Sequence, residues 1–390
     1  MEIKKAFETK LSDLLNQAKK GEIRKKNHFK NLTFNRNKII VYGFGSGFTP
    51  LYNSVLSRFN LKPEFIIDKK FNTLSQKKNL KKTNFLGSNE LASIKNKEEY
   101  AVIVSLGSKK KFELIFKKLK GQGFDIIVWG PDIFEYNIHH LDGSFDKNPK
   151  LFFKSRQDII NSFNLLKDNK SRSIFLDILE VYVTHTPSKI DSDDIKKQYF
   201  DLKLFKKNDY QNYINCGAYT GDSVKNLTMN IGKINSLICI EPDQKNFESL
   251  SVYCIDNSNK IAKSIYLYPL ALADNSSLIS FSSNLGLCSE IDLKNSSRNL
   301  IQTTKLDSLV SSESKYFISM DLEGYEKNAI KGMERIIKEG KSNLAISIYH
   351  RVSDLWTIIS QISDLNKKYN FYIRNYTGFT YETVLYCKLK

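Results

Sequence analysis

The sequence has 390 residues, which is enough for two or three domains that each bury a hydrophobic core. Its formal net charge of +18 gives a weak general attraction for anions, but only 9 of its 60 basic residues are arginines. Proteins read bases and phosphates mainly through arginine and aromatic clusters. Because the sequence shows no such cluster, we expect no nucleic-acid partner.

The cysteines and the hydropathy pattern argue against secreted and membrane-spanning classes. Five scattered cysteines with no Cys-x-x-Cys pair support neither a disulfide framework nor a zinc site: Cys216, Cys239, Cys254, Cys288 and Cys387. No apolar run reaches the roughly 18 residues that a membrane span requires, and residues 1–20 lack the apolar core of a signal peptide. The sequence therefore predicts a soluble cytoplasmic protein.

The first third of the chain is predicted to be a helix, a basic linker and a Rossmann-like α/β domain, at residues 2–20, 21–37 and 38–135. In that domain a strand at 38–42 leads into the glycine-rich turn GFGSG, a helix is expected at 50–59, and the next strand ends at Asp68. Phe48 occupies the third glycine position of the dinucleotide fingerprint, where a bulky side chain crowds helix-to-strand packing. Further helices are expected at 89–94 and 110–121, with strands at 101–105 and 126–129.

The function of this domain stays open at the level of sequence. A nucleotide-binding domain and a structural or partner-binding domain both fit the pattern. The stretches GFGSG, ELASI and AVIVSLGS resemble the small nucleotide-binding-like domain that precedes some bacterial sugar-modifying enzymes, but the resemblance fixes no ligand.

Residues 136–210 are predicted to be a helical connector. His139, His140 and His185 lie here, and we interpret them as surface residues because no carboxylate or cysteine stands at ligand spacing from them. The sequence therefore predicts no metal site in this segment.

Residues 211–390 alternate strands with helices again and centre on the stretch YINCGAYTGD at 213–222. A strand that ends in a glycine-rich turn and opens a helix lets a ligand lie against bare backbone and a helix N-terminus. The stretch SIYLYPLAL, residues 264–272, is expected to be one strand, and the chain closes with strands FYIRNY and TVLYCKL joined by a turn rather than a helix. A doubly wound sheet of about seven strands with a terminal antiparallel hairpin is the architecture of class I methyltransferases.

Polar residues follow several of the predicted strands. Ligands bind beyond the carboxyl ends of strands in open α/β sheets, so four strand ends should form one crevice: residues 215–221, Glu241 with Pro242, residues 269–271 and residues 321–324. His350 follows a fifth strand. An acid about 20 residues past the glycines is where such folds hold ribose hydroxyls, so the ligand is expected to be a nucleotide, and an adenosyl group in particular.

Several of these stretches together resemble the FkbM-type methyltransferase family, from about residue 150 to 388: YINCGAYTGD, CIEPD, TTKLDSL, ISMDLEGYEKNAIKGM and ISIYHRVSDLW…YIRNYTGFTYETVLYC. The resemblance implies S-adenosylmethionine as methyl donor. It also implies O-methylation of a hydroxyl, commonly on a sugar or glycan intermediate, as in bacterial capsule or polysaccharide biosynthesis.

Carried over by position, the resemblance implies a cofactor site made of Asn215, Gly217, Ala218, Gly221, Asp222, Glu241, Pro242, Leu270 and Ala271. The glycine-rich turn would face the methionine end, Glu241 would take the ribose hydroxyls, and Leu270 and Ala271 would lie beside adenine. Asn215 stands where the family usually has Asp, and Ser319 stands where a Lys commonly precedes the acidic motif. Cofactor binding is expected to persist despite these two departures, and to be weaker.

The candidate catalytic residues are Asp321, His350 and Glu323. Asp321 is the first candidate base, and His350 the second, because an unperturbed imidazole has a pKa near 6.5. His350 could equally be a structural histidine at the end of a strand. Asp321 and Glu323 could instead hold a divalent cation that activates a diol.

Two other functions remain compatible with the sequence. One is a nicotinamide-dependent oxidoreductase that uses GFGSG and Asp68; the other is a non-catalytic nucleotide- or sugar-binding protein with a decayed site at Asn215. The acceptor pocket is expected to come from residues 283–300 and 131–210. The N-terminal helix leaves room for a homodimer.

Overall fold

The structure is a computed structural model that describes residues 2–20, 38–45, 48–52, 56–57, 61–72, 84–134, 148–184, 186, 189–282, 290–291, 300–311 and 313–390. These residues group into two compact units. Unit 1 comprises Met1–Phe153, Leu176–Asp191 and Thr377–Thr380, and unit 2 comprises Lys154–Phe175, Ser192–Tyr376 and Tyr381–Lys390. His139, His140, His185 and Cys288, together with most of residues 283–300, lie outside the described residues.

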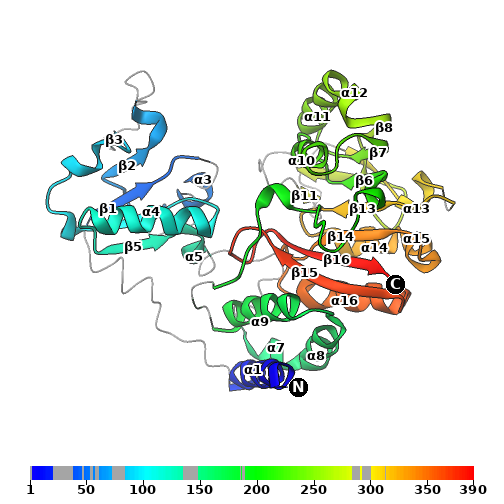
Figure 1. Cartoon of the computed structure of the whole chain (residues 1–390), viewed down its shortest axis with the longest axis horizontal. Helices are drawn as coiled ribbons and strands as arrows, with labels where there is room; N and C mark the ends of the chain where they lie inside the picture. The colour runs from blue at the N-terminus through cyan, green and yellow to red at the C-terminus, as the bar shows by residue number, and fades with distance from the viewer. Residues whose placement is uncertain are drawn as a thin grey trace. The chain divides into compact units, whose positions relative to one another are not determined.

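Unit 1 contains a five-stranded, all-parallel sheet in the order β3-β2-β1-β4-β5 (Figure 1). Its strands are β1 (Lys38–Tyr42), β2 (Phe65–Asp68), β3 (Asn84–Gly87), β4 (Tyr100–Val104) and β5 (Ile126–Trp129). Between and beside them lie α1 (Glu2–Lys20), α3 (Phe48–Leu51), η2 (Lys69–Asn72), η4 (Glu90–Ser93), η5 (Lys97–Glu99), α4 (Lys109–Gly121), α5 (Gly130–Phe134) and α7 (Lys150–Lys154). This strand order is the first part of the doubly wound order. The helix expected at 89–94 is a short 3-10 helix, η4.

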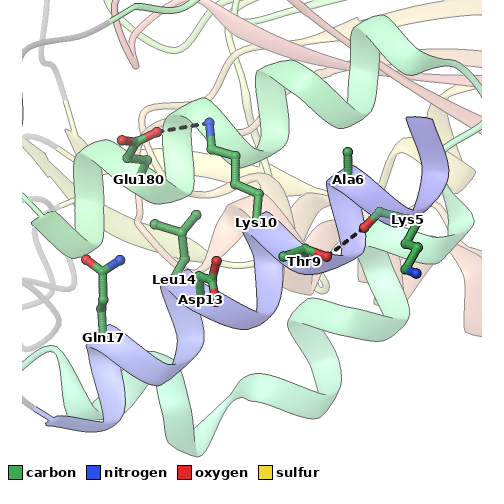
Figure 2. Close-up of a pocket in the computed structure, with 8 residues that line it drawn as sticks. All are labelled: Lys5, Ala6, Thr9, Lys10, Asp13, Leu14, Gln17 and Glu180. Atoms are coloured by element: carbon green, nitrogen blue, oxygen red, sulfur yellow. Dashed lines mark hydrogen bonds and ion pairs between the residues drawn. The ribbon is translucent and has the colours of Figure 1, made fainter. Parts of the chain in front are cut away.

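The N-terminal helix α1 packs in unit 1 against the later turns of α9 (Asn169–Thr184). Lys10 reaches Asp177 and Glu180 at 2.8 and 2.9 Å, as Figure 2 shows for Glu180. An open groove of about 640 Å³ runs along this contact and is lined by Lys5, Ala6, Thr9, Lys10, Asp13, Leu14, Gln17 and Glu180. None of these residues is a predicted site residue.

Unit 2 is built on a seven-stranded sheet in the order β15-β16-β14-β13-β6-β7-β8. Its strands are β6 (Asn212–Cys216), β7 (Ile234–Ile240), β8 (Ala262–Tyr268), β13 (Phe317–Met320), β14 (Asn343–Ser347), β15 (Tyr369–Asn375) and β16 (Thr383–Leu389). Only β16 runs against its neighbours, pairing antiparallel with both β14 and β15. The expected class I methyltransferase sheet with a terminal hairpin is therefore confirmed.

Helices connect these strands, and α11 and α12 lie at the β7–β8 end of the sheet (Figure 1). The helical elements are α8 (Arg156–Leu165), η6 (Ile195–Lys197), η7 (Lys207–Tyr210), α10 (Asp222–Asn230), α11 (Gln244–Asp256), α12 (Ser258–Ile261), α13 (Leu306–Leu309), α14 (Glu326–Lys331), α15 (Glu334–Glu339) and α16 (Asp354–Leu365). Central strands such as β13 and β14 are nearly continuous apolar runs because a parallel sheet is covered on both faces. Among the described residues, no helix combines the length and apolar character needed to cross a lipid bilayer.

The segment expected to be one strand at 264–272 is split between two sheets. β8 ends at Tyr268, and β9 (Ala271–Leu272) pairs instead with β12 (Leu300–Thr304), in a small sheet with β10 (Leu278–Ser282) and β11 (Glu290–Ile291). Pro269 separates the two strands, and a proline cannot donate to a continuing ladder. The expectation of a single strand was therefore wrong.

Arg374 on β15 holds the segment that precedes β6. Its guanidinium is buried and pairs with Asp168 at 2.7 Å and with Asp201 at 3.0 Å. Asp201 lies two residues after Tyr199, a residue with φ of 68°. The arginine therefore helps to fix Tyr199, which reaches the carboxyl edge of the sheet from outside it.

Candidate active site

The carboxyl ends of β6, β7 and β13 meet at one edge because the three strands are parallel and in register. Cys216 lies opposite both Ile240 and Met320. Gly217 donates its backbone N–H to Ile240 at 2.9 Å, and Asp321 donates its own to Cys216 at 2.9 Å. Gly217 and Asp321, two of the predicted site residues, therefore come directly after the ends of adjacent, hydrogen-bonded strands.

Gly217 is the point of closest approach between the glycine-rich turn and the acidic loop. Its φ is +81°, and a Cβ built there would lie 1.8 Å from the carbonyl oxygen of Asp321. Only glycine fits such a position, first because of its backbone angle and second because no side-chain atom can enter the space. Gly221, with φ of +88°, precedes α10 and is less crowded, with Tyr253 at 3.1 Å from its built Cβ.

Glu241 follows β7 and holds the glycine-rich turn. One carboxylate oxygen accepts the Tyr219 N–H at 2.8 Å, and the other accepts the Asp243 N–H at 3.0 Å. Burial raises the pKa of Glu241, and these backbone hydrogen bonds oppose the rise. Oε1 also accepts from the Asn246 side-chain amide at 3.5 Å, so Oε2 is the oxygen that keeps a lone pair for a ligand hydroxyl.

The two departures from the family pattern lie opposite each other on neighbouring strands. Ser319 Oγ donates to Asn215 Oδ1 at 3.0 Å, and Tyr213 donates its hydroxyl to Ser319 at 2.7 Å. Asn215 is 2% exposed, and its Nδ2 has no hydrogen-bond partner among the described residues. The positions where the family usually has Asp and Lys therefore carry two neutral side chains that are hydrogen-bonded to each other.

The remaining predicted cofactor residues lie around the same strand ends. Ala218 is buried and donates to Ile240, and Asp222 is the exposed first residue of α10. Pro242 and Leu270 are half-buried, and Ala271 is buried in β9. The end of β8 joins this edge through the Glu241 N–H, which donates to Tyr268 at 3.1 Å.

The predicted catalytic residues form a buried ionic cluster with a fourth residue, Glu326. His350 Nε2 lies 3.4 Å from Asp321 and 3.4 Å from Glu323, while its Nδ1 lies 2.9 Å from Glu326. The side chain of His350 is 5% exposed, that of Asp321 is 26% exposed, and that of Glu323 is 36% exposed. Glu323 is therefore the carboxylate most open to an incoming molecule.

Further groups complete the cluster, and sequence reasoning did not identify them. Tyr199 donates its hydroxyl to Asp321 at 2.8 Å, and Tyr349 donates to the same carboxylate at 3.3 Å. Glu382, the last residue of the β15–β16 connection, accepts from Gln198 at 2.5 Å. Glu326 lies inside the MDLEGYE stretch, so the motif contained a signal for it, whereas the tyrosines and Glu382 carry no recognisable spacing.

The pKa values follow from burial and from the density of charge. Burial alone lowers the pKa of His350, but Glu326, Asp321 and Glu323 outweigh it and raise that pKa to about 10. Burial raises the pKa of Glu323 to about 8, with His350 opposing the rise and Asp321 adding to it. Burial also raises the pKa of Glu382 to about 7 and that of Asp321 above its usual range. The three acids thus favour the cationic form of the imidazole, and a role of His350 as a base stays a prediction.

Asp321, Glu326 and His350 each offer a ligand atom within 4.8 Å of the others, which is the spacing of a metal site. Carboxylate and imidazole are a fitting donor set for a divalent transition metal. Both ring nitrogens lie beside carboxylates, and among the described residues neither makes a hydrogen bond, so a divalent cation at this cluster stays a prediction.

The glycine-rich turn of unit 1 is only partly described, because Ser46 and Gly47 lie outside the described residues. Asp68 accepts the Phe44 N–H at 2.7 Å and the Lys70 N–H at 3.0 Å. Each carboxylate oxygen of Asp68 therefore accepts one backbone N–H. Nucleotide binding by unit 1 stays a prediction.

Residues 215–374 match the sequence model of the methyltransferase FkbM domain. The chain contains an FkbM methyltransferase domain. The resemblance was expected from residue 150 to 388, and it is confirmed over residues 215–374. The domain covers β6 to β15, and therefore every predicted site residue. No curated protein matches the sequence.

A solved crystal structure with a TM-score above 0.5 agrees with this fold. The crystal structure of methyltransferase FkbM from Methylobacillus flagellatus KT is 18% identical, covers 99% of each chain and has a TM-score of 0.68. At that identity the likeness supports the fold alone. A putative rRNA-methylase from Clostridium thermocellum is 10% identical, with 50% of this chain and 95% of that chain covered and a TM-score of 0.32.

Replacing Gly217 tests the contact between the turn and the acidic loop. Gly217→Ala should cost more than about 3 kcal/mol of unfolding free energy, because the methyl group meets a carbonyl in addition to the left-handed backbone. Gly232→Ala is the matched control, since Gly232 has φ of +94° with nothing within 4 Å of its built Cβ, and it should cost only about 1–2 kcal/mol. Urea unfolding measures both, and equal costs would contradict the close approach.

Proposed function

We propose that the protein is an S-adenosylmethionine-dependent O-methyltransferase that acts on a hydroxyl of a sugar or surface-glycan precursor. The observation that carries the proposal is the hydrogen-bonded edge where Gly217, Glu241 and Asp321 follow three adjacent strands of an FkbM domain. A parallel sheet binds its ligand at such an edge.

The donor subsite is proposed to lie between the glycine-rich turn and Glu241. The turn at residues 217–221 presents backbone with no side chain at its crowded point, and α10 begins directly after it. Glu241 keeps a lone pair on Oε2 that can accept a ribose hydroxyl. Leu270 and Ala271, after the neighbouring strand β8, would cover the adenine.

When bound, the donor supplies an electrophilic methyl group on a sulfonium centre. The chain then has to orient the acceptor hydroxyl and to take its proton, while the new oxygen–carbon bond forms and the sulfur–carbon bond breaks. Orientation can contribute roughly 7–11 kcal/mol, and a positioned base can add about 10²–10⁴-fold.

Glu323 is the base that the geometry favours. Its side chain is more exposed than those of Asp321 and Glu326, and its pKa of about 8 is close to the pH at which a base works best. Asp321 accepts from two tyrosines and faces His350, so its lone pairs are largely used and it is better suited to orienting an acceptor. The raised pKa of His350 favours its protonated form, which has no lone pair with which to accept a proton.

A sugar-type acceptor fits the chemistry of the cluster. Carboxylates accept hydrogen bonds from hydroxyls, and a vicinal diol can donate to two acids at once. Glu323 and Asp321 both lie within 3.4 Å of the same imidazole nitrogen, so they stand close enough to act on one polyol.

Binding of the product S-adenosylhomocysteine tests the donor subsite without knowledge of the acceptor. At a ligand concentration of 100 times Kd, it should add about 2.7 kcal/mol to the unfolding free energy and raise Tm. Glu241→Gln should weaken binding, whereas the unit 1 variant Asp68→Asn should leave it unchanged. No heat in calorimetry and no shift in Tm would reject the function, and stabilisation by NADH alone would favour an oxidoreductase.

The pH dependence of methyl transfer tests the base. Glu323 must be deprotonated to act, so turnover should rise with pH through about 8 and level off above it. Glu323→Gln should lower kcat by about 10²–10⁴-fold and flatten this rise while leaving S-adenosylhomocysteine affinity unchanged. The measurement is product formation with a sugar acceptor that gives turnover. A Glu323→Gln variant that keeps the wild-type profile would move the role to Asp321.

A further inference from the structure

In the acidic cluster of unit 2, three buried polar atoms have no hydrogen-bond partner among the described residues. They are Nδ1 and Nε2 of His350 and Oε2 of Glu326. The side chain of His350 is 5% exposed and that of Glu326 is 1% exposed. Burying a polar atom without a partner is costly, and such atoms are normally satisfied by protein groups, water or an ion. The three atoms therefore indicate a ligand inside the cluster.

The spacing of the donor atoms fits a single ion. Asp321, Glu326 and His350 each offer one atom that lies within 4.8 Å of the others. The shortest contacts run from the imidazole, at 2.9 Å to Glu326 and 3.4 Å to Asp321. Metal–ligand bonds of about 2.0–2.2 Å hold the ligand atoms of one ion roughly 3–4 Å apart. Small side-chain adjustments are enough to close the three donors on an ion.

Outer hydrogen bonds hold both carboxylates in place. Asp321 Oδ2 accepts the Tyr199 hydroxyl at 2.8 Å, while Oδ1 is the oxygen nearer to the imidazole. Glu326 Oε1 accepts the Leu322 N–H at 2.8 Å, which leaves Oε2 bare. The carboxylate ligands of metal sites are oriented by outer hydrogen bonds of this kind.

The surroundings of the His350 ring suit a metal ligand. In a ligating histidine, one nitrogen binds the ion and the other donates its N–H to a carboxylate, which fixes the orientation of the ring. His350 has a carboxylate beside each nitrogen, Glu326 at Nδ1 and both Asp321 and Glu323 at Nε2. A metal ion and a ring proton supply the same positive charge to these acids, and the ion displaces the proton when it binds.

The balance of charge also favours a divalent ion. Three carboxylates lie within 3.4 Å of the imidazole, whereas one imidazolium balances a single negative charge. Arg351, the next residue along the chain, donates its Nε to the Gly324 carbonyl at 3.1 Å. An ion of charge 2+ would balance two of the acids at once.

We propose that Asp321, Glu326 and His350 form a binding site for a divalent transition-metal ion such as Mn²⁺ or Zn²⁺. This donor set differs from the pair expected from sequence, because Glu326 and His350 take the place of Glu323. Carboxylates suit Mn²⁺, and the imidazole nitrogen favours a transition metal over Mg²⁺ or Ca²⁺. Three protein ligands leave a coordination position open. The use of that position rests on the proposed methyl-transfer function, in which it would hold the acceptor hydroxyl beside Glu323.

Calorimetric titration of the EDTA-treated full chain with Mn²⁺ tests the site. The wild-type protein should bind Mn²⁺ more tightly than Mg²⁺, and Tm should rise with Mn²⁺ concentration. His350→Gln and Glu326→Gln should each weaken Mn²⁺ binding by more than about 100-fold, since losing an outer partner alone costs about 10–100-fold. Equal Mn²⁺ affinity in wild type and His350→Gln would overturn the proposal, as would a wild-type protein that binds neither Mn²⁺ nor Zn²⁺.

Two further variants separate loss of a ligand from loss of charge or of folding. Glu382→Gln is the matched control, because Glu382 interacts electrostatically with Asp321 but is not one of the three donors. It should keep Mn²⁺ affinity within about tenfold of wild type. Glu326→Asp keeps a carboxylate and should recover part of the affinity that Glu326→Gln loses. A Glu382→Gln variant that loses as much affinity as Glu326→Gln would contradict the assigned donors.

Pulsed electron paramagnetic resonance of the bound Mn²⁺ gives a signature that a merely structural role would not produce. The spectrum should show coupling to an imidazole nitrogen, and ¹⁵N labelling at histidine should change that coupling. The sequence has five histidines, so its absence from His350→Gln assigns it to this ring. Bound Mn²⁺ without any nitrogen coupling would overturn the proposal.

Ligand binding separates this inference from the proposed function. Glu326→Gln should bind S-adenosylhomocysteine within about threefold of wild type, because Glu326 lies outside the proposed donor subsite. Mn²⁺ binding with the expected signature but without any methyl transfer would leave the metal site intact and reject the function alone. Methyl transfer by a protein that binds neither Mn²⁺ nor Zn²⁺ would reject the metal site and leave the function intact.

Discussion

The close approach of Gly217 to the carbonyl of Asp321 is the constraint on which the site depends. Parallel pairing of β6 with β13 brings the two loops together, and a Cβ on residue 217 would be 1.8 Å from the oxygen. The glycine-rich turn and the acidic loop therefore share a fixed geometry. A ligand that lies on the turn must then meet the acids, and an acceptor held by the acids must lie near the turn.

Electrostatic interactions at the same edge of the sheet set the charge states of the acids. The edge of the sheet carries Asp321, Glu323, Glu326 and Glu382 around the buried side chain of His350. Burial pushes the acids toward their neutral forms, and the imidazolium pulls them back toward their charged forms. The outcome differs between acids because exposure differs: Glu326 is sealed inside the domain, and Glu323 is open on one side.

The sequence allowed the strand ends to be predicted because that inference needs only two facts. Parallel strands end at one edge, and glycine and acidic residues at those ends are recognisable one by one. The ionic cluster could not be predicted in the same way. Tyr199 reaches Asp321 from 122 positions away in the chain, and its position depends on the buried pairing of Arg374 with Asp201. His350 was judged by the pKa of a free imidazole, but three neighbouring carboxylates change that pKa to about 10.

The prediction of a single strand at 264–272 was wrong for a local reason. Apolar periodicity does not show that the strand ends before Pro269 and that the chain then joins another sheet. Asn215 and Ser319 were noted as separate departures, and only the register of β6 and β13 shows that they bond to each other.

A crystal structure with S-adenosylhomocysteine tests the central claim most directly. The account predicts that the ligand lies along residues 217–221 with its ribose hydroxyls on Glu241 and its sulfur directed toward Glu323. A ligand bound at Gly43 and Asp68 in unit 1, with the edge of the seven-stranded sheet empty, would contradict it.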